Sequence, residues 1–110
     1  MNIDKYQDKA DLFQILSHPV RLQILDELRK RKTCVCHLQV VTQRPQAYVS
    51  QQLRILKDAN LVEDEKDGQN VFYHLRDATA RALLLETLGP PGAPQHLPGC
   101  TCPLCEMDRV

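Results

Sequence analysis

The sequence predicts one small domain that is mainly α-helical and carries one β-hairpin, in the order helix, helix, helix, helix, strand, strand, helix. Apolar residues recur at helical spacing in four stretches before residue 59 and in one after residue 76. Between them, Asp67-Gly68 separates two stretches of strand-forming residues. A chain of 110 residues can bury only one modest core, so we expect help from a partner chain.

The first two helices are expected over 4–16 and from Pro19 onward. The first has a broad apolar surface, made by Tyr6, Ala10, Leu12, Phe13, Ile15 and Leu16. Proline suits a first helical turn, with Ser17 or His18 near the cap. The buried side of the second helix is predicted to be Val20, Leu22, Ile24, Leu25 and Leu28. Its basic end, residues 29–32, suits the negative end of the helix dipole, and a phosphate contact is the alternative.

A short helix over 33–42 and a tight turn lead into a helix that begins at Pro45. Short helix, tight turn and second helix is the helix-turn-helix motif, whose second helix enters the major groove of DNA. The inward residues of this second helix are predicted to be Val49, Leu53 and Leu56. Residues suited to contact bases or phosphates are Gln43, Arg44, Gln46, Tyr48, Ser50, Gln51 and Arg54. We therefore expect double-stranded DNA as a partner.

The stretches 61–67 and 70–75 predict a hairpin directly after the helix-turn-helix motif, which makes it a wing. Val71, Tyr73 and Leu75 alternate with Phe72 and His74, so the two sets should face opposite sides. The expected backbone contacts to DNA are Lys66, Gln69 and Asn70. Three successive carboxylates at 63–65 would repel phosphate, so either they face away or the wing contributes little.

The last helix is expected over 77–88, with Asp77 at its cap and a stripe that includes Ala80, Leu83, Leu84 and Leu88. Two flanking helices this apolar, on so small a chain, suggest a homodimer built from the first and last helices. Dimerisation would also suit DNA binding, because paired half-sites raise affinity.

Charge is divided unevenly although the formal net charge is zero. Residues 1–59 hold 10 Lys/Arg against 6 Asp/Glu, a balance of +4, and residues 60–110 hold 4 against 8, a balance of −4. DNA would therefore face the first half. The sequence has no apolar run long enough to span a membrane and no signal-peptide pattern, so we expect a cytoplasmic protein with no membrane partner.

Five cysteines in a small cytosolic chain favour metal ligands or redox thiols over disulfides. Cys34 and Cys36 lie in mid-chain, and Cys100, Cys102 and Cys105 lie near the end. The stretch 89–99, rich in Pro and Gly, reads as a linker that can reach some 34 Å, to either its own subunit's cysteine pair or the partner's. The five thiols suit a soft ion, and His37 and His96 are less favoured zinc ligands.

The runs LSHPVRLQIL at 16–25, CVCHL at 34–38, AYVSQQLRILKDANLV at 47–62 and VFYHL at 71–75 resemble the ArsR/SmtB family of winged helix-turn-helix metal-responsive repressors. The resemblance covers about residues 6–88. It implies a homodimeric repressor that binds an operator in its apo form and leaves it when a metal or metalloid binds. It also implies that the first and last helices form the dimer.

The family resemblance implies that Cys34 and Cys36 belong to a thiol motif, although the chain departs from the known patterns. Arsenite-sensing members carry a third cysteine where this chain has Gln39, and cadmium- and lead-sensing members use an N-terminal arm, whereas residues 1–33 here hold no cysteine. The family's Asp and His site on the last helix also looks absent, because no histidine follows between 76 and 94. The tail cysteines are therefore the expected completion.

We thus expect a DNA-binding and dimerisation domain over 1–88 and a linker with a cysteine-rich tail over 89–110. The predicted function is a transcriptional repressor released by a thiophilic ion, As(III)/Sb(III) or Cd(II)/Pb(II)/Zn(II), with no organic cofactor. The alternative is a redox-sensing repressor of the same fold, whose thiols oxidise. An enzyme is not expected, because the sequence has no phosphate loop, nucleophile elbow or acid/base pair in a pocket-forming context.

Overall fold

The computed structural model describes residues 3–93. The elements in this range are α1 (Ile3–Leu16), α2 (Pro19–Lys30), β1 (Thr33–Cys34), α3 (Val35–Thr42), α4 (Gln46–Asp58), β2 (Val62–Asp67), β3 (Asn70–Leu75) and α5 (Ala78–Leu88). The predicted mainly helical fold with a hairpin is confirmed, with one short strand added. The predictions on His96, Cys100, Cys102 and Cys105 fall outside the described residues.

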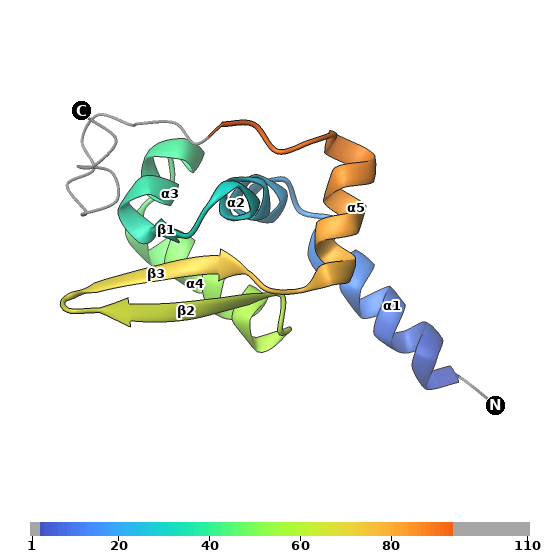
Figure 1. Cartoon of the computed structure of the whole chain (residues 1–110). Helices are drawn as coiled ribbons and strands as arrows, with labels where there is room; N and C mark the ends of the chain where they lie inside the picture. Colours follow the sequence, from blue (N-terminus) through green and yellow to red (C-terminus); the bar gives the residue numbers. More distant parts are fainter. Residues whose placement is uncertain (1–2, 94–110) are drawn as a thin grey trace.

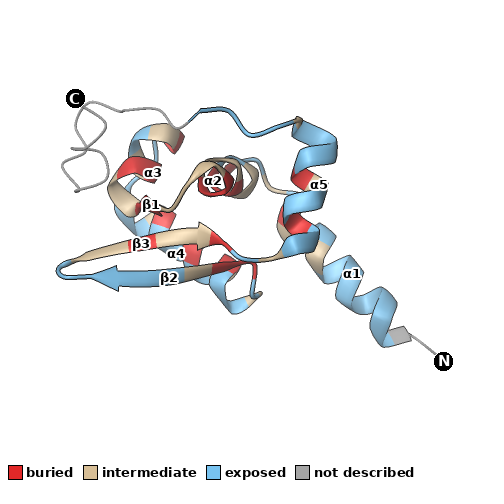
Figure 2. Ribbon diagram, in the orientation of Figure 1, coloured by how far each residue is buried: buried red, intermediate tan, exposed pale blue. Residues whose placement is uncertain are grey.

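The core surrounds α2, which lies at the centre of Figure 1 with α3, α4, the hairpin and α5 arranged about it. Ile24 and Leu25 of α2 have no exposed surface, nor do Leu53 and Leu56 of α4. Burying each such side chain contributes roughly 1.5–3 kcal/mol, so this cluster holds α4 against α2. In Figure 2 the buried positions gather along the inward faces of these elements, and the far end of the hairpin is exposed.

The β-sheet has three antiparallel strands in the order β1-β3-β2. Strand β1 pairs with the wing, because Thr33 lies opposite Tyr73 and Cys34 lies opposite Phe72. The prediction of a helix that starts at residue 33 was therefore wrong by two residues. Pairing with β3 keeps Thr33 and Cys34 extended, which local helical periodicity does not reveal.

The helix starts largely follow the predicted capping residues. His18 caps α2, where its Nδ1 accepts a hydrogen bond from the Arg21 N–H at 3.4 Å. Asp77 caps α5, where its carboxylate accepts from the Ala80 N–H at 2.8 Å. Pro45 differs from the prediction: its ψ of 156° is extended, so it is the cap of α4 and the helix begins at Gln46.

The hairpin does not bury alternate residues as predicted. Phe72 and Leu75 are buried, whereas Val71 and Tyr73 are only half-buried. Leu75 lies at the base of the hairpin and joins the core, while Phe72 lies beside β1 with the Lys32 ammonium 5.5 Å from its ring centre. The wing extends past the core, so a single inward face does not run along its whole length (Figure 1).

Helix α1 projects from the body of the molecule (Figure 1). It keeps large apolar side chains exposed. Large exposed apolar side chains on α1 and α5 are Tyr6, Phe13, Leu85 and Leu88. Leu84, which was grouped with the apolar dimer surface, is instead 1% exposed and belongs to the subunit's own core. Within residues 3–93, no helix is both long and apolar enough to cross a membrane.

Candidate functional site

Helix α4 has one buried side and one exposed side. Val49, Leu53 and Leu56 have no exposed surface, as predicted. The exposed predicted contact residues are Gln46, Ser50, Gln51 and Arg54. These side chains offer uncharged donors and acceptors together with one guanidinium, which suits base edges and phosphates in a major groove. The hydrophobic pattern of α4 thus leaves a continuous polar side for a ligand.

The turn before α4 is shaped by its own residues. Gln43 adopts left-handed backbone angles, with φ 55° and ψ 40°, and so ends α3. Arg44 is exposed, and its guanidinium lies 5.4 Å from the centre of the Tyr48 ring, which is half-buried. This cation–π contact favours one orientation of both side chains. The two predicted DNA contacts therefore lie next to each other at the start of α4.

A partly buried hydrogen bond, which sequence reasoning missed, holds α4 to α2. The Arg21 Nε–H donates to Gln52 Oε1 at 2.8 Å, and Gln52 is only 5% exposed. Arg21 also donates to the Ile15 carbonyl at 3.4 Å, at the end of α1. Gln52 lies three residues after Val49 and four before Leu56, so a polar residue in an apolar stripe was the available signal.

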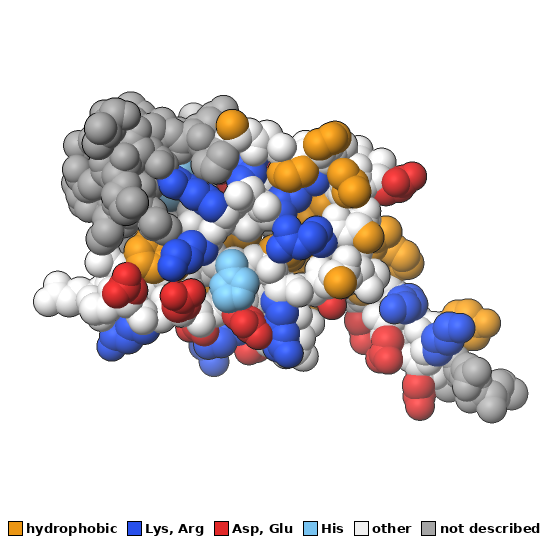
Figure 3. Space-filling model, viewed as in Figure 1, with side chains coloured by type: hydrophobic (Ala, Val, Ile, Leu, Met, Phe, Trp, Pro, Cys, Tyr) orange, Lys and Arg blue, Asp and Glu red, His pale blue; other side chains and the backbone are white. Residues whose placement is uncertain are grey.

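The three neighbouring carboxylates of the wing, at 63–65, are paired with basic side chains. Lys57 Nζ of α4 lies 3.0 Å from Asp64, and Lys32 Nζ lies 3.4 Å from Glu65. The Lys57 ammonium lowers the pKa of Asp64, and Asp64 in turn raises the pKa of Lys57. Figure 3 shows acidic, basic and histidine side chains intermingled over this face of the hairpin. These pairs reduce the repulsion that three neighbouring carboxylates would otherwise exert on phosphate.

Two further partners face Glu63, and the predicted wing contacts lie near the tip. Glu63 lies 3.3 Å from His74 Nε2 and 3.1 Å from Arg76 Nε. Lys66 and Gln69 are exposed and Asn70 is half-buried. Gly68 takes φ 62° in the turn between the two strands, a conformation that glycine adopts without strain.

The basic end of α2 makes contacts inside the subunit. Arg29 Nε lies 2.7 Å from Asp26, its Nη1 donates to the Gly89 carbonyl at 2.7 Å, and its side chain is 3% exposed. Lys30 Nζ lies 2.8 Å from Glu27. The alternative of a phosphate contact is therefore wrong for Arg29, because a buried side chain cannot reach a DNA backbone.

The cysteine pair lies where β1 passes into α3. Cys34 is the cap of α3, and its Sγ accepts a hydrogen bond from the His37 N–H at 3.4 Å. Cys34 is 6% exposed, and Cys36 is half-buried. Both cysteines line a cleft of about 400 Å³. Its other lining residues are Val35, Gln46, Gln69, Asn70, Val71 and Tyr73. One cleft thus joins the cysteines to the first residue of α4 and to the wing tip.

The donor set of this cleft fits a soft ion only in part. Thiolates bind thiophilic metals and metalloids in preference to magnesium or calcium, and such ions take three or four ligands. Within residues 3–93, no group of three or more His, Cys, Asp or Glu side chains is placed to hold a metal ion. The described part of this cleft therefore offers two thiols, Cys34 and Cys36, which is fewer than such an ion takes.

An ion-pair chain connects the cysteine region to α2. His37 Nε2 lies 3.3 Å from Glu27 Oε2, and the other Glu27 oxygen lies 2.8 Å from Lys30 Nζ. The hydrogen bond from His37, followed by the Lys30 interactions, holds the pKa of Glu27 below its ordinary value, despite burial. His37 is 2% exposed and has this structural partner, which does not favour it as a zinc ligand.

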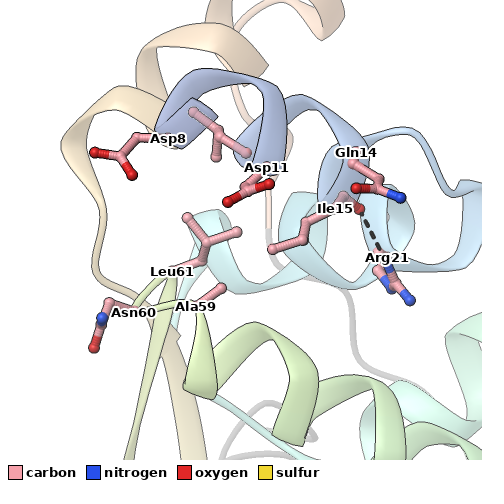
Figure 4. A pocket seen from close by; sticks show the side chains of 9 residues that line it. Asp8, Asp11, Gln14, Ile15, Arg21, Ala59, Asn60 and Leu61 are labelled. Atoms are coloured by element: carbon pink, nitrogen blue, oxygen red, sulfur yellow. Dashed lines mark hydrogen bonds between the residues drawn. The ribbon is translucent and has the colours of Figure 1, made fainter. Parts of the chain in front are cut away.

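A second cleft, of about 690 Å³, lies between α1 and the turn from α4 into β2 (Figure 4). Asp8, Asp11 and Ile15 of α1 line one side, and Asn60 and Leu61 line the other. It is larger than the cysteine cleft, but none of the predicted DNA or metal contacts lies in it. The candidate functional site is therefore made of α4, the wing and the cysteine cleft.

Comparison with known proteins gives a consistent family assignment. Residues 18–64 match the family model described as bacterial regulatory protein, arsR family. The arsenical resistance operon repressor of Bacillus subtilis (strain 168) is 41% identical over 85 residues, which are 76% of this chain and 78% of that protein. A transcriptional repressor SmtB homolog of Synechocystis sp. is 38% identical over 77 residues, which are 70% of this chain but only 58% of that protein.

Solved structures extend the likeness to the fold. The crystal structure of the transcriptional repressor BigR from Xylella fastidiosa superposes with a TM-score of 0.68 at 32% identity. The matched region covers 77% of this chain and 86% of that chain. The family-model match over residues 18–64 includes α2, the helix-turn-helix motif of α3 and α4, and the start of β2. The chain belongs to the ArsR/SmtB family of winged helix-turn-helix transcriptional regulators, which are not enzymes.

Proposed function

We propose that this protein is a homodimeric cytoplasmic repressor that binds double-stranded operator DNA and leaves it when a thiophilic ion binds to Cys34 and Cys36. The observation that supports this proposal most is the shared cleft. Both cysteines line it together with Gln46, at the start of α4, and Asn70 of the wing. An ion held there can act on both predicted DNA-binding elements. The tail cysteines at 100, 102 and 105 are proposed to complete the ligand set.

Recognition of DNA is assigned to the exposed side of α4. Ser50, Gln51 and Arg54 are proposed to make most base and phosphate contacts. Gln43, Arg44, Gln46 and Tyr48 would act at the start of the helix, and Lys66, Gln69 and Asn70 would reach the backbone from the wing. The division of the chain into a DNA-binding and dimerisation domain over 1–88 and a metal-binding tail over 89–110 follows from these roles.

Dimerisation is assigned to α1 and α5. Tyr6 is 71% exposed, Phe13 is 55% exposed and Leu88 is 50% exposed in the single subunit. Burying apolar surface contributes roughly 25 cal/mol of stabilising free energy per Å². Packing against the same two helices of a second subunit would therefore stabilise a dimer. Two copies would also present two α4 helices to two half-sites, which raises affinity for an operator.

Release requires only that the ion prefer the conformation that cannot bind DNA. A hundredfold preference corresponds to about 2.7 kcal/mol of coupling free energy. One additional bond between a soft ion and a thiolate can supply this amount. As(III) and Sb(III) favour three thiolates, whereas Cd(II), Pb(II) and Zn(II) accept four, and the five cysteines of the chain provide enough for either class.

Serine substitution at the cysteine pair tests the proposal. Serine at position 34 keeps a side-chain acceptor for the His37 N–H, so Cys34→Ser should preserve the cap of α3 while removing a soft ligand. We expect the Cys34→Ser and Cys36→Ser variants to bind the operator with wild-type affinity in a gel-shift titration. Both variants should stay bound to it when arsenite or cadmium is added. Thr42→Ser, which keeps a hydroxyl on the same helix, is the matched control and should still respond.

Truncation after Gly99 tests the role assigned to the tail. The truncated chain should keep operator affinity, and its ion affinity should fall or its choice of ions should narrow. If the truncated chain bound every ion with wild-type affinity, the tail cysteines would not be ligands of the ion.

Redox sensing is distinguished by the state of the thiols. If reduced apo protein leaves DNA on adding arsenite or cadmium, and every thiol can still be alkylated after chelation, the redox alternative fails. Release that needs an oxidant and is reversed by a thiol reductant would instead replace the metal-sensing proposal.

A further inference from the structure

Arg44 lies in the turn of the helix-turn-helix motif, and the residues around it restrict its backbone. Gln43, directly before it, has left-handed angles with φ 55°, a conformation that is uncommon for residues other than glycine. Pro45, directly after it, disfavours helical angles at Arg44 and favours an extended backbone there. Gln23 of α2 adds a bond to this turn, because its Nε2–H donates to the Val41 carbonyl at 2.9 Å. The turn therefore fixes the point from which the Arg44 side chain departs.

The Tyr48 ring restricts the rest of the Arg44 side chain. The guanidinium carbon of Arg44 lies 5.4 Å from the centre of this ring, a distance at which a cation is attracted to the face of an aromatic ring. Tyr48 is half-buried and packs against the hydrophobic core, and the next residue, Val49, has no exposed surface. A ring that is held by the core thus supports a guanidinium on an exposed residue.

The charge of Arg44 is not compensated within the described part of the chain. Lys57 pairs with Asp64 at 3.0 Å and Arg76 pairs with Glu63 at 3.1 Å, whereas no carboxylate among residues 3–93 is paired with Arg44. The cation–π contact offers no acceptor oxygen to the guanidinium, so the hydrogen-bonding capacity of its N–H groups remains for another partner. A planar fork of N–H donors with a positive charge suits a phosphate.

The place of Arg44 in the motif indicates which part of the DNA it meets. The second helix of a helix-turn-helix motif contacts base edges in the major groove, and the helix before it crosses the sugar-phosphate backbone. Arg44 lies between these two helices. We propose that Arg44 binds a DNA phosphate and that Tyr48 is a positioning residue, which makes no contact with DNA and acts by holding the Arg44 guanidinium against its ring. This inference rests on the proposed function and divides the roles of two residues at the start of α4.

The contact assigned to Arg44 is tested with two DNA duplexes of equal length. One is selected by the wild-type protein from a random-sequence pool, and the other has an unselected mixed sequence. Arg44→Ala should weaken binding to both duplexes by the same factor. The slope of log affinity against log salt should become shallower by about 0.9 for each subunit, because each subunit loses one phosphate contact. Weaker binding to the selected duplex alone would indicate a base contact and overturn this assignment. Wild-type protein that binds neither duplex would refute the proposed function itself.

Two substitutions at Tyr48 test its positioning role. Tyr48→Leu keeps an apolar side chain against the core but removes the ring, so it should lower the affinity for both duplexes roughly twofold to fivefold for each subunit. Tyr48→Phe keeps the ring and loses only the hydroxyl, so it should recover the affinity that Tyr48→Leu loses. If Tyr48→Phe bound DNA as weakly as Tyr48→Leu, the hydroxyl and not the ring would carry the effect, and the inference would be wrong. Wild-type affinity in Tyr48→Leu would equally overturn it.

A double-mutant cycle separates positioning from a general structural effect. In the Arg44→Ala background Tyr48→Leu should cause no further loss of affinity, because no guanidinium remains for the ring to hold. In the Arg54→Ala background its full loss should persist, since Arg54 is an exposed arginine of the same helix that has no ring contact within residues 3–93. Additive losses from Arg44→Ala and Tyr48→Leu would show that Tyr48 acts independently of Arg44 and would overturn the inference. If Tyr48→Leu fails to fold, the cycle is repeated with Tyr48→Met, whose flexible side chain fills irregular gaps.

Discussion

Arg21 Nε donates a hydrogen bond to Gln52 Oε1 at 2.8 Å and so joins the centre of the core to the inward side of α4. The same guanidinium reaches the Ile15 carbonyl at the end of α1, as the dashed line in Figure 4 shows. The Arg21 side chain therefore contacts both α1, which is proposed to form the dimer, and α4, which is proposed to bind DNA. This connection gives α4 a defined position relative to the proposed dimer surface.

Gln52→Ala should destabilise the fold, because it leaves the Arg21 donor without its acceptor. We expect a loss of ~1–3 kcal/mol in the free energy of unfolding, measured with urea, together with weaker operator binding. Gln51→Ala is the matched control on the exposed side. It should change the unfolding free energy by less than about 0.5 kcal/mol and still weaken operator binding by ~1–3 kcal/mol. Equal stability of the two variants would contradict the assignment of Gln52.

Charged substitutions on α1 and α5 should separate dimerisation from folding. Phe13→Glu and Leu88→Glu alter side chains that are 55% and 50% exposed, so both variants should fold, sediment as monomers and bind the operator weakly. Leu84→Glu, at a residue that is 1% exposed, should instead unfold the chain, because burying an unpaired charge costs several kcal/mol. Sedimentation and far-ultraviolet circular dichroism distinguish these results. A Leu88→Glu variant that remains a tight dimer would exclude α5 from the interface.

Asp64→Asn should release Lys57 from its partner on the wing. The Lys57 ammonium would then be available to a phosphate, and the slope of log affinity against log salt should steepen by roughly 1. The pair is exposed, so little change in stability is expected. Glu63→Gln is the control, because Glu63 pairs with His74 and Arg76 and not with α4. An identical salt slope for the Asp64→Asn and wild-type proteins would argue that Lys57 does not face the DNA.

Glu27 should make stability depend on acid pH. Its folded-state pKa is lowered from the ordinary 4.5, chiefly by the hydrogen bond from His37, so its charged form is favoured in the folded chain. That contribution is fully present above the unfolded value and is lost as the pH falls through the lowered one. Wild type should therefore exceed Glu27→Gln in urea-measured stability at pH 7, and the difference should shrink at about pH 3. Glu86→Gln, at an exposed residue of α5, should show no such dependence. If the stability difference between wild type and Glu27→Gln were as large in acid as at pH 7, it would reflect the packing of the Glu27 side chain and not its charge.

The sequence by itself determined the helices, the wing and the polar side of α4. Each depends on signals within a few residues: the spacing of Val49, Leu53 and Leu56, the cap at Asp77, and the glycine at position 68. Such patterns act locally, because an amphipathic helix must place its apolar residues on one side whatever it packs against. The family motifs lie in these same segments, so the family could also be recognised from the sequence.

Only the tertiary structure decided which side chains meet across long separations in the chain. Cys34 is extended because β3 pairs with it, and Leu84 is buried while Leu85 remains 51% exposed. The bonds from Arg21 to Gln52 and from Arg29 to Gly89 join residues 31 and 60 positions apart. Periodicity cannot predict such contacts, since they depend on how the elements pack and on which buried polar groups then need a partner.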